Sequence, residues 1–130
     1  MRCFNMDKKE LLKLYDKNLD ELIEISSKIT RINFKNEVEA CSIISAKTGN
    51  CSENCKYCSQ SSLSSAKIKC HQLLSKEEII EAAKKAKENG ATRFCIVTSG
   101  RSISDEDFPK ILDMIKSVSS IKGLHCCASL

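Results

Sequence analysis

Residues 75–100 read SKEEIIEAAKKAKENGATRFCIVTSG, and this stretch decides the fold. Ser75 followed by Glu78 matches the capping box that begins a helix. Asn89 and Gly90 are typical of the residues that end one. The β-branched and aromatic residues within 93–98 then favour a strand. We therefore predict a helix that leads through a short turn into a strand.

The same alternation extends to both sides of this stretch. Residues 38–46 are rich in Val, Ile and Cys and are predicted to form an earlier strand. A later helix is predicted to start near Asp105, with Pro109 in its first turn and Gly123 at its end. Its expected apolar stripe consists of Phe108, Ile111, Leu112, Ile115 and Val118. Residues 124–129 are the third predicted strand, so the order indicates parallel strands joined by right-handed helical crossovers.

The predicted fold class is α/β, a partial (β/α) TIM-type barrel with N-terminal helices and roughly its first three strands. Residues 1–36 are expected to form a helical segment, with helix over 7–30 and with Asp7 and Asp20 as N-caps. Residues 37–130 are expected to form the first part of the barrel. A full barrel needs about 200 residues or more, and parallel sheets need both faces covered. We therefore expect these 130 residues to be the N-terminal part of a longer barrel and to be inactive alone.

Composition argues against several classes of function. The 21 basic and 17 acidic residues are interleaved, which is typical of solvated helix faces and not of a nucleic-acid surface. No apolar run approaches the ~18 residues of a membrane span, and no secretory signal follows Met1, so we expect a cytoplasmic protein. Nine cysteines in a reducing compartment favour metal or redox chemistry over disulfides.

Three of the cysteines stand in a loop shortly after the first predicted strand. Residues 51–58 read CSENCKYC, a C-x3-C-x2-C spacing. The C-terminal ends of strands are where α/β barrels carry their chemistry, and thiolates at such a spacing can converge on one iron–sulfur cluster. Three protein ligands leave one iron of a four-iron cluster open, as a catalytic centre requires. A zinc site is the alternative, but it usually needs paired knuckles, and the chain has only His71 and His125.

The cysteine motif lies within the longer stretch AKTGNCSENCKYCSQS at 46–61, and two further stretches read RFCIVTSGR at 93–101 and CASL at 127–130. All three resemble the biotin synthase family of the radical S-adenosylmethionine (SAM) superfamily. The resemblance implies a (β/α) barrel of the radical SAM kind. It also implies an enzyme that inserts sulfur into dethiobiotin to make biotin by means of a 5′-deoxyadenosyl radical. The implied cofactors are a [4Fe-4S] cluster, a [2Fe-2S] cluster and SAM.

The resemblance also implies which residues hold the four-iron cluster and SAM. The cluster ligands would be Cys51, Cys55 and Cys58, and SAM would chelate the open iron. Tyr57 occupies the aromatic position beside the adenine, the alternative being that it packs within the loop. The match at 98–100 is too loose to assign contacts to SAM, and no catalytic side chain is assigned.

Two more cysteines match ligands of the family's second cluster, which has two irons and donates sulfur. They are Cys95 and Cys127, and the remaining ligands lie further along the family's chain. Side-chain alternation agrees, because it turns both thiols to the barrel lumen and turns Cys126 to the helices. Four cysteines are instead expected to be buried apolar residues without function, namely Cys3, Cys41, Cys70 and Cys126.

The implied partners are dethiobiotin, an electron donor such as flavodoxin or ferredoxin, and a second copy in a homodimer at full length. The sequence leaves two alternatives open. One is another radical SAM enzyme of carbon–sulfur chemistry or cluster maturation, against which Cys95 and Cys127 argue because many such relatives lack a second cluster. The other is a non-catalytic iron–sulfur electron-transfer protein, whose fully ligated cluster would not bind SAM.

Overall fold

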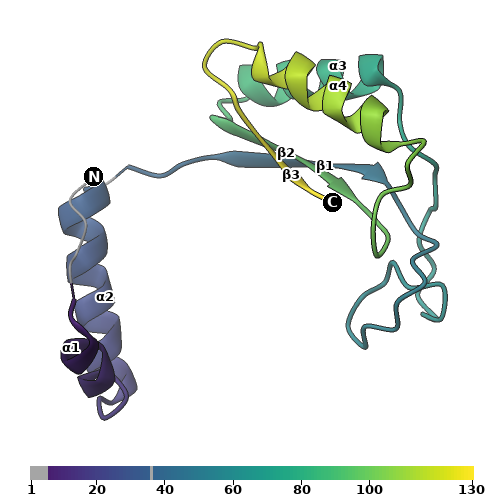
Figure 1. The fold of residues 1–130 in the computed structure, drawn as a ribbon. Helices are drawn as coiled ribbons and strands as arrows, with labels where there is room; N and C mark the ends of the chain where they lie inside the picture. The colour runs from purple at the N-terminus through teal and green to yellow at the C-terminus, as the bar shows by residue number, and fades with distance from the viewer. Residues whose placement is uncertain (1–5, 36) are drawn as a thin grey trace. The chain divides into compact units, whose positions relative to one another are not determined.

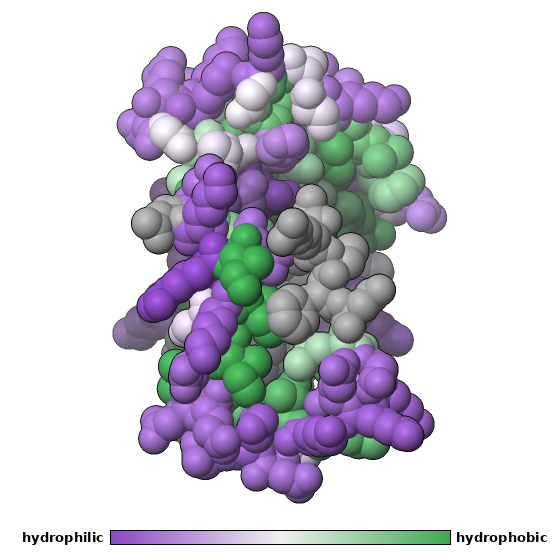
Figure 2. Space-filling view, turned by 90° about the vertical axis from the view of Figure 1, so that its left-hand side faces the viewer, coloured by the Kyte–Doolittle hydropathy of each residue, from purple (hydrophilic) through white to green (hydrophobic). Residues whose placement is uncertain are grey.

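The computed structural model describes residues 6–35 and 37–130, in two compact units, Met1–Val38 and Glu39–Leu130. The N-terminal unit contains two helices, α1 (Lys8–Lys13) and α2 (Leu19–Phe34). Neither helix buries a residue, and Figure 2 shows apolar surface lying open among hydrophilic side chains. No helix among the described residues is long and apolar enough to cross a membrane.

The two helices of this unit begin at capping boxes. Asp7 caps α1 as predicted, and its carboxylate accepts a hydrogen bond from the Glu10 N–H at 2.8 Å. Asp20 is not the cap of α2, and this prediction was wrong. The cap is Asn18, because Asn18 and Glu21 exchange side-chain and backbone hydrogen bonds of 3.0 and 3.2 Å, which places Asp20 inside the first turn.

The second unit alternates strands and helices as predicted. Its elements are β1 (Cys41–Lys47), α3 (Lys76–Glu88), β2 (Arg93–Thr98), α4 (Phe108–Ser119) and β3 (His125–Ser129). The three strands form one parallel sheet in the order β1-β2-β3, and α3 and α4 both lie on one side of it (Figure 1). The α/β class is thereby confirmed, and the arrangement is that of part of a (β/α) barrel.

Several boundaries differ from those predicted. The first strand starts at Cys41 and not at residue 38, because its partner β2 begins at Arg93 and the residues before Ala40 have no ladder to join. The last helix starts at Phe108 with Asp107 as its cap, and it ends at Ser119, before Gly123. Helix α3 and strand β2 have the predicted bounds.

The core lies between the sheet and the two helices. Its most deeply buried members are Ala46, Ile79, Ala83, Phe94, Ile96, Ile111, Met114, Val118 and Leu124. The predicted stripe of α4 was wrong at Phe108 and Leu112, which are 49% and 39% exposed. Met114 takes their place, because Ile111, Met114 and Val118 recur at three- and four-residue spacing on the sheet side of the helix.

Candidate functional site

The cysteine motif lies on a loop that leaves the carboxyl end of β1 and returns before α3; we call residues 48–71 the thiol loop. Its neck is an antiparallel bridge between Thr48 and His71, with N–H to O=C hydrogen bonds of 3.1 and 3.2 Å in the two directions. A second bridge joins Cys51 to Ser61 further out. The loop is therefore closed at two levels by backbone pairing, which limits the freedom of a segment without regular secondary structure.

The three motif cysteines differ in accessibility. Cys51 is 8% exposed, and its backbone pairs with Gln60 and Ser62 at 3.0 and 2.9 Å. Cys55 is exposed and Cys58 is half-buried, and the Cys58 N–H donates to the Cys55 carbonyl at 3.0 Å in a tight turn. One thiol is thus anchored in the loop, and the other two lie on a turn that solutes can reach.

Gly49 connects the loop to the end of β2. Its N–H donates to Gln60 Oε1 at 2.6 Å, and its carbonyl accepts from Ser99 Oγ at 2.7 Å. Its φ of +81° and the Cys70 side chain, into which a Cβ would project, leave no room for another residue. Sequence reasoning missed Gln60 and Ser99, because a polar residue in a loop carries no signal of its distant partner.

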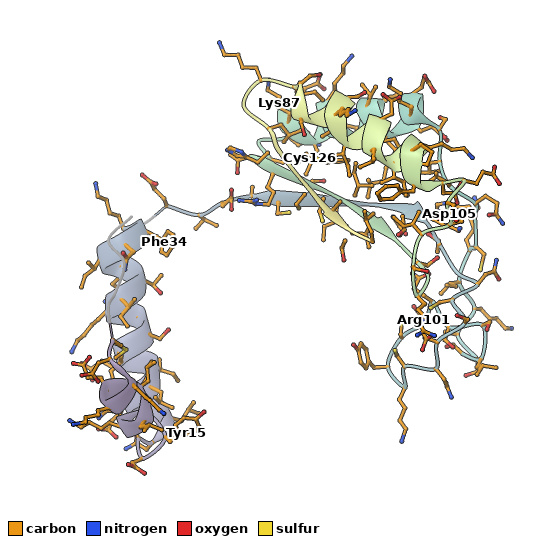
Figure 3. The ribbon with its side chains drawn as sticks, in the orientation of Figure 1. Tyr15, Phe34, Lys87, Arg101, Asp105 and Cys126 are labelled. Atoms are coloured by element: carbon orange, nitrogen blue, oxygen red, sulfur yellow. The ribbon has the colours of Figure 1, made fainter. Side chains whose placement is uncertain are left out.

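Arg101, which follows β2, reaches the same loop (Figure 3). Its Nε lies 3.8 Å from Glu53 Oε1, between two cysteines of the motif. The Arg101 side chain is 81% exposed, so this pair contributes little to stability. Its position still brings a positive charge to the loop that carries the three thiols.

The donor set of the loop fits an iron–sulfur cluster. Among the residues that the structure describes, no three Cys, His, Asp or Glu side chains could hold a single metal ion. A four-iron cube makes a different demand, because each thiolate binds a different iron and the ligand sulfurs therefore lie further apart. The loop offers three free thiols, and thiolates are the ligands that such clusters select. The assignment of Cys51, Cys55 and Cys58 as ligands stays a prediction.

Tyr57 stands between the last two cysteines and is 96% exposed. It does not pack within the loop, so that alternative explanation of its presence was wrong. A fully exposed aromatic ring beside the thiols is free to stack on a planar group. Its place beside the adenine of SAM stays a prediction.

Cys95 on β2 and Cys127 on β3 are register partners in the sheet. Such partners lie about 4.8 Å apart on the same face. Burial, and after it the neighbouring Cys127 thiol, raise the pKa of Cys95 to about 11. A metal bound by the pair would displace a proton that Cys95 holds tightly, because thiols bind metals as thiolates.

The other cysteines lie elsewhere. Cys126 packs against the core on the helix side of the sheet, as alternation predicted, and burial raises the pKa of its thiol (Figure 3). Cys41 and Cys70 are exposed, so the prediction that they are buried was wrong. Cys41 lies on the same sheet face as Cys95, at the first rung of β1, where no helix covers it. Cys3 lies outside the described residues.

Comparison with known proteins agrees with this arrangement. The model of the family described as the radical SAM superfamily matches residues 45–129. A biotin synthase of Methanococcus maripaludis strain C7 is 41% identical over 125 residues, 96% of this chain and 38% of the relative. Those of a Sulfurihydrogenibium species and of Pelotomaculum thermopropionicum are 40% and 43% identical, over 93% and 90% of this chain and 36% of each relative. The chain thus spans little more than a third of the length of these relatives.

Proposed function

Because the chain belongs to the radical SAM superfamily, we propose that it is the part of a biotin synthase that carries the iron–sulfur loop. The reaction is the insertion of sulfur into dethiobiotin. One observation carries the proposal beyond the superfamily: a second pair of thiols, Cys95 and Cys127, faces the uncovered side of the sheet in register. The relatives named biotin synthase support the same choice at about 40% identity.

The thiol loop would hold the four-iron cluster through Cys51, Cys55 and Cys58. When bound, that cluster supplies the electron that cleaves SAM and starts radical chemistry. The chain's own contribution is position. The bridge to Ser61 holds Cys51, and the turn at Cys55–Cys58 presents the other two thiols to solution. Tyr57, exposed on the same turn, would lie against the adenine of SAM.

The pair on the sheet would hold the two-iron cluster. When bound, that cluster supplies the sulfur that the product gains. Cys95 and Cys127 lie on neighbouring strands at the same height, so two thiolates can reach one small cluster without rearrangement of the sheet. The further ligands would come from the part of such an enzyme that follows the third strand.

On the same basis we propose partners and a cellular location. The substrate would be dethiobiotin, the electron donor a flavodoxin or ferredoxin, and the working form a cytoplasmic homodimer at full length. Another radical SAM enzyme of carbon–sulfur chemistry is the rival function. The register of Cys95 with Cys127 favours biotin synthase, because a single-cluster enzyme has no use for a second paired set of thiols.

The first test is whether the loop binds the four-iron cluster. Full-length protein, reconstituted anaerobically and then reduced, should show a four-iron paramagnetic signal and should cleave SAM to 5′-deoxyadenosine and methionine. Cys55→Ala should lose the signal and the cleavage, because a cluster with two protein ligands is not retained. Cys70→Ser, which changes an exposed thiol of the same loop outside the motif, is the matched control and should keep both. Equal iron and equal signal in Cys55→Ala would refute the assignment.

A further inference from the structure

His71, at the neck of the thiol loop, makes hydrogen bonds through both ring nitrogens. Its Nδ1 lies 2.8 Å from the Gln72 carbonyl oxygen, and its Nε2 lies 2.9 Å from Thr48 Oγ1. Thr48 Oγ1 lies 2.7 Å from Ser45 Oγ on β1. A side-chain series Ser45–Thr48–His71 therefore runs beside the two backbone hydrogen bonds that pair Thr48 with His71.

For a neutral imidazole, the direction of each hydrogen bond in this series follows from the Gln72 carbonyl. A carbonyl oxygen only accepts, so His71 carries a proton on Nδ1. In a neutral imidazole Nε2 then has a lone pair and accepts from the Thr48 hydroxyl. Thr48 has one hydroxyl proton, so the Ser45 hydroxyl must be the donor in the last contact. The Lys47 carbonyl, 3.2 Å from Ser45 Oγ, is its longer alternative.

We propose that His71 is a positioning residue for the thiol loop, acting as a neutral imidazole that accepts a hydrogen bond from Thr48. Thr48 is the residue from which the loop departs, three positions before Cys51. Gly49 and Asn50, between Thr48 and Cys51, have positive φ angles of +81° and +55°, a region that few residues adopt without support from their neighbours. The hydrogen bond from the Thr48 side chain to His71, added to the two backbone hydrogen bonds, fixes the position of the residue before this segment.

The position of Thr48 matters to Cys51 because only Gly49 and Asn50 separate these two bridged residues. The inner bridge of Thr48 with His71 is antiparallel, and the outer bridge of Cys51 with Ser61 is a separate, parallel one. Gly49 lies between them, and its backbone is already committed to Gln60 and Ser99. A shift at Thr48 is therefore passed on to Cys51 and not absorbed. This inference deepens the proposed function and depends on it only for the SAM readout below.

The tautomer is tested first, on the unmodified protein. Full-length protein labelled with 15N at histidine should show His71 with a protonated Nδ1 and an unprotonated Nε2, the minor form of a free imidazole side chain. The resonance is assigned by its loss in His71→Gln. His125, exposed on β3, serves as the reference histidine. A proton on Nε2 of His71 would overturn the proposal, because that nitrogen could no longer accept from Thr48.

Two substitutions then separate the hydrogen bond from packing. In His71→Gln the side-chain amide oxygen can still accept from Thr48, whereas in His71→Leu nothing can. In cluster-free protein, amide hydrogen exchange at Gly49–Ser62 should quicken about fivefold in His71→Leu, which corresponds to about 1 kcal/mol for one neutral hydrogen bond. It should stay within about twofold of the unmodified protein in His71→Gln and in the control His125→Gln.

The loaded protein gives the second readout. The KM for SAM should rise about fivefold in His71→Leu with little change in kcat, and His71→Gln should restore it. Equal exchange rates in the Leu and Gln variants would show that the hydrogen bond from Thr48 does not hold the loop and would overturn the proposal. If the unmodified protein failed to cleave SAM, the proposed function would fail, while the tautomer and exchange results would still decide the role of His71.

Discussion

At the scale of single residues, one step along β3 separates two chemical environments. Cys126 packs against the core beneath the helices, and Cys127 faces the opposite side beside Cys95. The strand alternates so strictly that neither thiol can replace the other without a slip of register, which would turn every side chain over. Cysteines adjacent in the sequence thus lie on opposite faces of the sheet.

This alternation makes a prediction for the sulfur-donating cluster. In folded full-length protein, Cys95→Ala and Cys127→Ala should each lose the two-iron absorption and biotin formation while the four-iron signal remains. Cys126→Ala should keep both clusters and lose about 1 kcal/mol of stability, because it removes a partly buried sulfur from the core. Iron and sulfide content, absorption spectra and thermal unfolding are the measurements. A Cys126→Ala variant without its two-iron cluster, beside an intact Cys127→Ala, would show that the strand is shifted by one residue.

The residues of the candidate site were predictable to different extents. The spacing of Cys51, Cys55 and Cys58 is local, so the sequence displays it directly. Partners such as Gln60 and Ser99 become visible only when the chain has folded, because they meet Gly49 from 11 and 50 positions away. The burial predicted for Cys41 and Cys70 came from the average behaviour of cysteine, which says nothing about a particular strand end or loop.

At the scale of elements, an ion pair joins the end of β1 to the start of α4. Lys47 Nζ lies 3.2 Å from Asp107 Oδ2, and the Asp107 side chain is only 17% exposed. Burial raises the pKa of Asp107, but hydrogen bonds from Lys47 and Lys110 outweigh it and hold the pKa below its usual value. The pair thus links the strand that carries the thiol loop to a helix of the covering layer.

Asp107→Asn should therefore destabilise the folded protein by about 1 kcal/mol at neutral pH. Because the folded-state pKa is lowered, the stability from this carboxylate is present above the unfolded pKa of about 3.9 and is lost as pH falls through the lower folded value. The difference between the variant and the unmodified protein should shrink below about pH 4. Denaturant unfolding at pH 7 and in acid measures it.

The matched control is Asp113→Asn, which removes the partner of Lys76 at 2.8 Å. Both of these side chains are more than a third exposed, so its effect should be close to zero. Equal losses from the two substitutions would contradict the role given to Asp107.

Element existence was easier to predict from sequence than element ends. The helix from Ser75 and the strand at 93–98 carry their own start and stop signals, and both were predicted correctly. The start of β1 depends on where β2 begins to pair, and the choice of Asn18 over Asp20 depends on a partner at Glu21. Met114 was missed because its position in the apolar stripe depends on where α4 starts.

At the scale of the whole molecule, the parallel sheet sets which groups can meet. All three strands are parallel, so the thiol loop after β1 and the segment after β2 both leave the carboxyl end of the sheet. From that end Ser99 reaches the loop at Gly49, and Arg101 reaches it at Glu53. Helices α3 and α4 cover one face of the sheet, and the paired thiols Cys95 and Cys127 lie on the other. The fold thus directs both sets of cysteines away from the helical layer.

The last prediction concerns the N-terminal unit, Met1–Val38. Every hydrogen bond given above for the thiol loop and the thiol pair joins residues of Glu39–Leu130, so the proposed iron sites rest on contacts within that unit. We therefore expect a variant of the longer enzyme with residues 1–38 deleted to bind the same number of iron atoms per chain and to show the same four-iron signal after anaerobic reconstitution. The deletion retains Glu39, whose carboxylate accepts hydrogen bonds from Arg93 at 3.0 to 3.2 Å beside the first rung of the sheet. The matched control is the same deletion variant with Glu39→Gln added. This change should weaken that end of the sheet slightly and leave the iron content unchanged, because the Arg93–Glu39 ion pair is half exposed. Loss of the four-iron signal on deletion of residues 1–38 alone, in protein that still folds, would mean that the N-terminal helices help to hold the thiol loop.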